Sequence, residues 1–195
     1  MKNKEKDNQE ILEIISKKIN KTLQKTTESI TIKENHYSVA NNEIIALNLA
    51  NNNRNYFPEE IGFLEELNYL DLSNNDLEII PSFVRQLKKL AVLKISHNRL
   101  SSLPEWLAEL TNLRVLAVDN NQLYSIPSSI NQLTILRKLY LQGNPIHRLP
   151  LEIFELNLLE ELHIDFRTTI KKPVKGILSH LTSNGCIIYS NYNRR

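Results

Sequence analysis

Apolar residues return along this chain at a fixed interval of 23 residues. The interval is clearest in residues 90–112, where Leu90, Leu93, Ile95 and Leu100 stand at the first, fourth, sixth and eleventh positions of the unit. Units in the same phase start at residues 44, 67, 90, 113, 136 and 159 without an insertion. Such a period predicts a solenoid, in which each unit buries its apolar side against its neighbours.

Each unit predicts a short strand followed by a short helix. Apolar and polar residues alternate locally over the first seven positions, as in Leu70-Asp71-Leu72, which is typical of a strand. A proline later in the unit, such as Pro81, fixes φ and suits the first position of an α or 3₁₀ helical turn. Successive strands should pair in parallel, and the wider helices should curve the stack so that the strands line its concave side.

An asparagine follows the strand in five units, at Asn52, Asn75, Asn98, Asn121 and Asn144. A buried amide at a turn must form hydrogen bonds, and here the partners should be backbone groups of its own unit and the next. We therefore expect an asparagine ladder with a structural role.

The second unit shows the whole motif. Its residues Leu67, Leu70, Leu72, Asn75, Leu77, Ile80 and Pro81 read L-x-x-L-x-L-x-x-N-x-L-x-x-I-P. This motif resembles the leucine-rich repeat family. The resemblance implies an α/β leucine-rich repeat solenoid: a curved horseshoe with a parallel β-sheet on the concave face and short α or 3₁₀ helices on the convex face. Residues 44–166 would hold five full repeats, starting at 44, 67, 90, 113 and 136, and a partial sixth at 159.

The flanking segments predict two caps. In residues 1–43, apolar positions at helical spacing predict an amphipathic helix over 9–25, after a disordered segment 1–8, and a hairpin over 29–39 that turns at 33–36. We expect the helix to dock on the open end of the core; a membrane-surface or partner-binding helix is the alternative. In residues 167–195, a helix over 173–184, a strand over 186–189 and a basic tail should close the other end.

Charge and cysteine content narrow the function classes. The formal net charge of +2 does not favour a nucleic-acid or membrane partner, and the basic tail lacks the interleaved aromatics of single-strand binding. One cysteine, Cys186, excludes an intramolecular disulfide framework. No signal peptide or membrane span is visible at the N-terminus. We expect a cytoplasmic protein, although a secreted bacterial effector without a cleavable signal would look the same.

The predicted concave face carries a candidate binding site. Strand residues that point away from the core form columns with neighbours about 4.8 Å apart. Within these columns an apolar and aromatic band is edged by charges, which is the composition of interface hot spots. The resembled family commonly binds proteins on this face. The predicted protein-binding residues are Tyr69, Asp71, Val92, Lys94, Val115, Ala117, Asp119, Lys138, Tyr140 and His163.

Signals for catalysis are few. No histidine stands in a metal-ligand motif, and the four glycines are too scattered for a phosphate loop, so no cofactor or metal is expected. His163 and Asp165, beside Tyr140 and Gln142, could do acid–base work, but a solvated rim of polar residues would look identical. Cys186 is flanked by isoleucines and is expected to be buried.

The pattern therefore predicts a monomeric, non-enzymatic module that binds a protein partner on its concave face, as a signalling adaptor or regulatory subunit. By resemblance to cytosolic members, a small GTPase or a phosphatase subunit is the partner class implied. The alternative is a self-assembling scaffold that uses the caps or an outer patch formed by Phe83 and Trp106. Those two aromatics could instead lie over the helices and complete the core.

Overall fold

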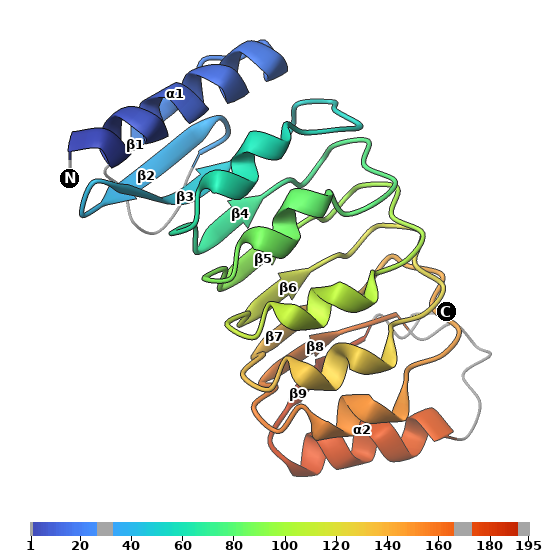
Figure 1. The fold of residues 1–195 in the computed structure, drawn as a ribbon. Coiled ribbons are helices and arrows are strands. Elements are labelled where there is room, and N and C mark those ends of the chain that lie inside the picture. Colours follow the sequence, from blue (N-terminus) through green and yellow to red (C-terminus); the bar gives the residue numbers. More distant parts are fainter. Residues whose placement is uncertain (1, 27–32, 166–172, 191–195) are drawn as a thin grey trace.

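The structure, a computed structural model, describes residues 2–26, 33–165 and 173–190. It is a curved stack with the helix α1 (Lys2–Ile19) at one end and the helix α2 (Pro173–Ser183) at the other (Figure 1). Nine strands form one sheet in chain order, β1 to β9, and every pairing is parallel except the β2–β3 pair. The leucine-rich repeat solenoid predicted from the sequence is confirmed.

Repeats two to five each contribute a three-residue strand and a five-residue 3₁₀ helix; the first repeat adds another such helix, and the partial sixth adds another such strand. The strands are shorter than the predicted seven positions, because only the third to fifth positions pair. They are β4 (Tyr69–Asp71), β5 (Val92–Lys94), β6 (Val115–Ala117), β7 (Lys138–Tyr140) and β8 (Glu161–His163). The 3₁₀ helices are η1 (Glu59–Phe63), η2 (Ser82–Gln86), η3 (Glu105–Glu109), η4 (Ser128–Gln132) and η5 (Leu151–Glu155), each preceded by its proline.

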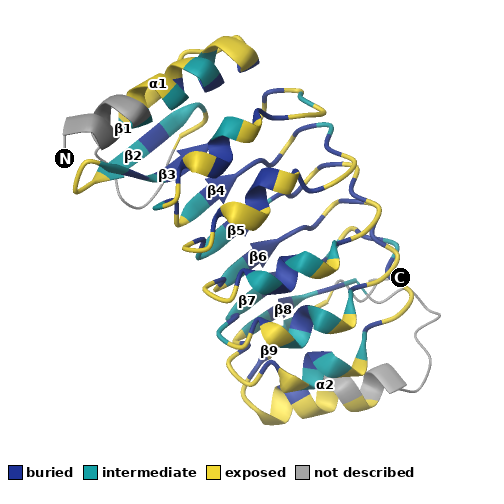
Figure 2. Ribbon diagram, in the orientation of Figure 1, coloured by how far each residue is buried: buried dark blue, intermediate teal, exposed yellow. Residues whose placement is uncertain are grey.

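The core lies between the sheet and the 3₁₀ helices (Figure 2). The leucines at the first and fourth positions of the repeats, such as Leu90 and Leu93, are fully buried. The asparagine ladder forms as expected, except that the side chains of Asn75, Asn98, Asn121 and Asn144 reach back to the preceding repeat, and that of Asn52 reaches Asn35 in the cap. Asn98, for example, donates to the carbonyl of Leu72 at 3.0 Å.

A second column explains how each strand ends. The residue before the ladder asparagine has a positive φ in five repeats, between 52° and 71°. L-residues rarely adopt this left-handed conformation, and Asn, Gly and to a lesser extent His tolerate it best. The column comprises Asn51, Asn74, His97, Asn120 and Gly143. The turn out of the strand therefore selects the residue type.

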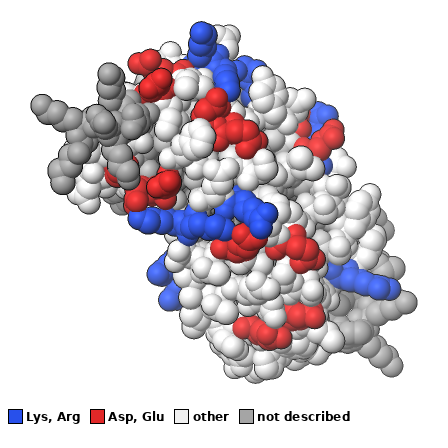
Figure 3. All heavy atoms as spheres, viewed as in Figure 1, with Lys and Arg blue, Asp and Glu red and all other residues white. Residues whose placement is uncertain are grey.

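Ion pairs join neighbouring repeats on the helical side, where acidic and basic side chains adjoin (Figure 3). Lys89 lies 2.5 Å from Glu66, and Glu109 pairs with both Arg85 and Lys88. These hydrogen bonds from Arg85 and Lys88 lower the pKa of Glu109 to about 2. All of these groups are solvent-exposed, so each pair contributes little to stability.

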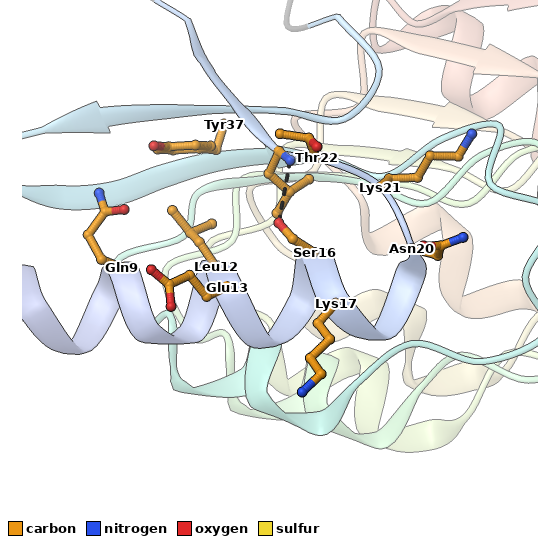
Figure 4. A pocket seen from close by; sticks show the side chains of 10 residues that line it. Gln9, Leu12, Glu13, Ser16, Lys17, Asn20, Lys21, Thr22 and Tyr37 are labelled. Atoms are coloured by element: carbon orange, nitrogen blue, oxygen red, sulfur yellow. Dashed lines mark hydrogen bonds between the residues drawn. The ribbon is translucent and has the colours of Figure 1, made fainter.

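The N-terminal cap differs from its predicted form. The helix α1 begins at Lys2 and ends at Ile19, with Asn20 in the left-handed conformation, so residues 2–8 are helical where disorder was predicted and residues 20–25 are not part of the predicted helix. It docks on the first repeat, where Leu12 and Ile15 are buried; Leu12 faces β2 (His36–Ala40) at a shallow cleft lined by Tyr37 (Figure 4).

Arg54 explains why the first repeat departs from the motif. It stands where the other repeats have Leu or Ile, and its guanidinium Nη2 donates to the carbonyl of Ile19 at 2.6 Å. Ile19 is the last residue of α1, so the arginine satisfies a free helix-end carbonyl. Lys18 adds an ion pair to Glu60 of η1 at 2.7 Å. The first repeat exchanges a core residue for a contact that fixes the cap.

The hairpin also lies elsewhere. The strand β2 pairs antiparallel with β3 (Glu43–Asn48) around Asn41 and Asn42, both at positive φ, which matches a type I′ turn. A short strand β1 (Gln24–Thr26) runs parallel to β2. The predicted first hairpin strand falls on residues 27–32, outside the described residues. At the other end, α2 and β9 (Ile187–Tyr189) match the predicted helix and strand closely; residues 166–172 and the tail 191–195 are outside the description.

Candidate functional site

The strand register builds the concave face as two straight columns. The first column, which carries the third position of each repeat, runs Ala46, Tyr69, Val92, Val115, Lys138, Glu161 and Ile187. The second, which carries the fifth position, runs Asn48, Asp71, Lys94, Ala117, Tyr140, His163 and Tyr189. The predicted residues Tyr69 to His163 in these columns are therefore brought together on one surface.

The N-terminal half of the face is an apolar strip with a charged border. Tyr69, Val92 and Val115 are each half-buried in successive strands. The Lys94 ammonium lies 5.3 Å from the centroid of the Tyr69 ring, within cation–π range. The Tyr69 hydroxyl donates to Asp71 Oδ2 at 3.2 Å, and burial together with the Asp71 carboxylate raises the pKa of Tyr69. Tyr69 is thus held in a fixed orientation as a neutral phenol.

The C-terminal half is a stack of three rings. The centroid of Tyr140 lies 4.4 Å from that of His163, which lies 4.2 Å from that of Tyr189. Beside the stack, Glu161 Oε2 accepts from the Tyr140 hydroxyl at 3.3 Å and lies 3.4 Å from His163 Nε2. Its other oxygen is 2.7 Å from the Lys138 ammonium.

These contacts shift the pKa values of three side chains in the C-terminal half of the face. The hydrogen bond from Lys138 lowers the pKa of Glu161, and the same bond raises the pKa of Lys138. Burial and the nearby Glu161 carboxylate raise the pKa of Tyr140. Near neutral pH this half of the face therefore presents neutral phenol rings beside the ion pair of Lys138 and Glu161. Such a preformed surface has little side-chain freedom left to lose on binding.

Three of the predicted residues are covered in the free protein. Asp71, Ala117 and Asp119 are all less than a tenth exposed. Asp71 Oδ1 accepts from the backbone N–H of Ser73 at 2.9 Å, and Asp119 accepts from the hydroxyl of Ser96. These carboxylates hold the strand ends in place. The exposed surface that a partner would meet is formed by the tyrosines, valines and lysines around them.

Sequence reasoning predicted the last strand, β9, but did not place its residues in this face. Ile187 and Tyr189 of β9 extend the two columns, and both remain substantially exposed, at 56% and 46%. The signal was present, because side chains two apart in a strand point to the same side. What the sequence could not give was the register of β9 against β8, which lies beyond the last recognisable repeat.

The other candidate groupings are weaker in the structure. His163 turns towards Glu161, while Asp165 Oδ2 accepts from the Gly143 backbone N–H at 2.6 Å. Within the described residues, no cluster of His, Cys, Asp or Glu could hold a metal ion. Phe83 is fully buried, so the predicted outer patch of Phe83 and Trp106 does not exist as such, and the alternative in which Phe83 completes the core is correct.

Two further properties bear on the class of protein. Cys186 is buried, and burial raises the pKa of its thiol, which makes it a poor nucleophile. Over residues 2–26, 33–165 and 173–190, helices long and apolar enough to cross a bilayer are absent.

Comparison with known proteins agrees with the repeat pattern. A family model described as a leucine-rich repeat region matches residues 44–125. A leucine-rich repeat protein of Leptospira interrogans is 35% identical over 74% of this chain and 36% of that one, with a TM-score of 0.66. No curated protein matches the chain significantly.

Two structures from Arabidopsis thaliana are also similar. A chain of the BIR3–SERK2 complex is 37% identical over 58% of this chain and 63% of that one, with a TM-score of 0.53. The ectodomain of the membrane receptor kinase GASSHO1/SCHENGEN3, in complex with CASPARIAN STRIP INTEGRITY FACTOR 2, is 28% identical over 70% of this chain and 17% of that one, with a TM-score of 0.55. The present chain thus spans less than two thirds of each of these proteins. The in-phase repeats, the solenoid and these likenesses show that the chain belongs to the leucine-rich repeat family.

Proposed function

We propose that the concave face binds a protein partner and that the chain acts without enzymatic chemistry, as an adaptor or regulatory subunit in the cytoplasm. The observation that carries the proposal is the pair of unbroken columns from Tyr69 to Tyr189, in which half-exposed apolar and aromatic side chains lie side by side. Clustered tyrosines in a rigid setting are typical hot-spot residues.

The likeness to GASSHO1/SCHENGEN3 supports the proposal, because that ectodomain is bound to CASPARIAN STRIP INTEGRITY FACTOR 2. The BIR3–SERK2 structure is likewise a complex of two proteins. Small GTPases and phosphatase subunits are the partner classes to test first, because the family resemblance points to signalling proteins.

Site-specific crosslinking tests the proposal. A photoreactive phenylalanine analogue at Val92 or Val115, both half-buried on the concave face, is compared with the same analogue at Leu151, exposed on η5. In a lysate of the source organism, we expect one protein to crosslink from the two concave positions and not from Leu151. Tyr69→Ala combined with Tyr140→Ala should abolish that product.

A control separates loss of the surface from loss of the fold. Tyr124→Ala removes an equally large side chain that is 58% exposed away from the concave columns. This variant should crosslink like the wild type. A product that forms equally from Leu151, or that survives the double tyrosine variant, would contradict concave binding.

A further inference from the structure

A groove of about 430 Å³ crosses the first three repeats, away from the concave columns. It lies over the segments that lead from the asparagine ladder into the 3₁₀ helices η1, η2 and η3. Its lining includes three aromatic residues, the buried Phe57 and the more exposed Tyr56 and Trp106, with Ile79 between the latter two in the repeat order. Its volume is within the range of sites that hold small organic or short peptide ligands.

Two side chains of the groove are unusually exposed for their size and apolar surface. Ile79 is 72% exposed and Tyr56 is 59% exposed, while Trp106 packs partly against the core. Isolated exposed apolar residues are common on protein surfaces, but a contiguous group around a hollow marks an interaction site. The lining residues Phe57, Leu77 and Ile80 are themselves buried core residues, so the floor of the groove is preformed.

Charge narrows the class of ligand. Among the residues that line the groove, all within the described range 55–106, Glu59 is charged and none is Lys or Arg. Glu78 and Glu105 lie next in sequence to the lining residues Ile79, Pro104 and Trp106. None of these three carboxylates has a Lys or Arg partner in the part of the chain that the structure describes, whereas Glu66 and Glu109 on the same helical side do. An occupant with a positive charge would complement this border.

Polar groups in the wall suit an extended backbone. The hydroxyl of Ser102 and the amide of Asn55 lie among the apolar side chains and can bond peptide groups, while the Ser82 hydroxyl donates to the Glu59 carboxylate at 3.1 Å. The groove crosses three repeats, so it spans two strand spacings, or roughly 10 Å. About three residues of extended chain cover this distance. A helix is itself about 10 Å wide, so only one of its ridges of side chains would contact the groove. Aromatic-lined grooves of this kind bind extended, proline-rich segments elsewhere.

We propose that this groove binds a short extended segment of a protein partner, with aliphatic or proline side chains over Tyr56, Ile79 and Trp106 and a Lys or Arg beside Glu59. The site is separate from the concave columns, so it does not depend on the function proposed for them. An anionic membrane surface is a poorer match, because its phosphates would approach the Glu59 carboxylate in the lining.

A random peptide library displayed on phage, selected against the full chain, tests the proposal directly. Sequences with two aliphatic or proline residues next to a Lys or Arg should be enriched. A labelled peptide from the selection should bind Tyr56→Ser/Ile79→Ser about tenfold more weakly than wild type in fluorescence anisotropy. The matched control Tyr124→Ser/Leu151→Ser, which alters two equally exposed side chains outside the groove, should stay within about twofold of wild type.

The charge requirement has its own variant. Glu59→Gln, Glu78→Gln and Glu105→Gln together should weaken the peptide severalfold at low salt and flatten its salt dependence, because exposed charge pairs are screened. Urea unfolding should show that all variants keep the wild-type stability. Tyr69→Ala/Tyr140→Ala should bind the peptide normally, so failure of the concave proposal would leave this one standing.

Several outcomes would overturn the proposal. These are no enriched sequence, enrichment of acidic sequences, or equal peptide binding by the Tyr56→Ser/Ile79→Ser variant. A dimer in light scattering that this variant abolishes would assign the groove to self-association. Sedimentation with phosphatidylcholine–phosphatidylglycerol vesicles that this variant alone abolishes would assign it to a membrane surface.

Discussion

Replacing Asn98 with alanine tests how much the asparagine ladder stabilises the solenoid. The Asn98 amide Nδ2 donates to the carbonyls of Leu72, Ile95 and Ser96 at 3.0, 3.2 and 3.2 Å. Its oxygen accepts from the backbone N–H of Leu77 at 2.9 Å. One buried side chain thus satisfies backbone groups in two repeats, at a turn where the backbone cannot pair with itself.

The magnitude follows from the one group left without a partner. Alanine removes the acceptor of the N–H of Leu77, a fully buried residue, whereas the Leu72 carbonyl keeps a hydrogen bond from Asn75 and the Ile95 carbonyl keeps one from Asn121. A buried polar group without a partner costs about 1–3 kcal/mol. We therefore expect Asn98→Ala to lower the free energy of unfolding by about 1–3 kcal/mol, a sizeable fraction of the total stability of an ordinary domain.

Two controls set the scale. Asn112→Ala removes one exposed hydrogen bond, from Nδ2 to the Lys88 carbonyl at 2.8 Å, and should cost less than about 0.5 kcal/mol because water replaces it. Asn52 stands first in the ladder, and its Oδ1 has no partner among the described residues. Asn52→Ala should therefore cost clearly less than Asn98→Ala.

Urea unfolding followed by circular dichroism measures the three differences. Repeat proteins can unfold in parts, so hydrogen exchange of the amides on either side of the substitution should accompany it. Equal losses for Asn98→Ala and Asn112→Ala would refute the ladder as a source of stability. A larger loss at Asn52 than at Asn98 would refute the assignment of bonds between repeats.

Three other predictions follow from local features of the structure. Gly143→Ala should destabilise the fold by about 1–3 kcal/mol in urea unfolding, because Gly143 has φ +71° and a Cβ there would lie 2.3 Å from the side-chain oxygen of Asn120. Gly176→Ala in the helix α2 should instead stabilise the fold by up to about 1 kcal/mol, because a Cβ there meets nothing within 4 Å. The hydrogen bond from Lys18 lowers the pKa of Glu60. This pair therefore stabilises the docking of α1 above the ordinary carboxyl pKa, and the stabilisation is lost as the pH falls through the lowered pKa of Glu60. Hydrogen exchange of α1 should show this acid dependence in the wild type and not in Lys18→Met. Because the pKa of Tyr69 is raised, ultraviolet titration should show one phenol that ionises at higher pH than an ordinary tyrosine, and this phenol should be absent in Tyr69→Phe. The free energy of unfolding should also fall as the pH rises above about 10, where the unfolded chain loses this proton first.

The repeats could be predicted from the sequence because the period is free of insertions. Once every unit keeps the same phase, the position of a residue in its unit fixes its column, and the register of Tyr69 against Val92 and Val115 follows without further information. The ladder asparagines were predictable for the same reason. In this part of the chain the local sequence pattern and the stacking of the repeats therefore favour the same structure.

The caps could not be predicted as well, because they have no repeating neighbour to fix them. Apolar periodicity begins at Ile11, but α1 begins at Lys2, since residues with good helical propensity extend a helix beyond its buried face. The burial of Asp71 and Asp119 was missed because alternation says which side of a strand a residue faces, and not how far its neighbours cover it. Pairwise contacts such as Arg54 with Ile19 join segments whose relative position no local pattern gives.

The two candidate surfaces use different consequences of the same stacking. On the concave face, strand pairing brings side chains of successive repeats into contact, so Tyr140, His163 and Tyr189 form a stack in which Tyr140 and His163 already contact Glu161. In the groove, the segments beyond the ladder lie outside the strands, and the exposed side chains of Tyr56 and Ile79 line a hollow whose Glu59 carboxylate has no Lys or Arg partner among the described residues. A preformed aromatic surface on the concave face suits a broad contact with a folded protein, whereas a hollow with a negative charge suits a short, positively charged peptide segment. Because one rigid core separates them, occupation of one site should leave affinity at the other unchanged, and measured coupling between them would show that the stack is less rigid than its packing implies.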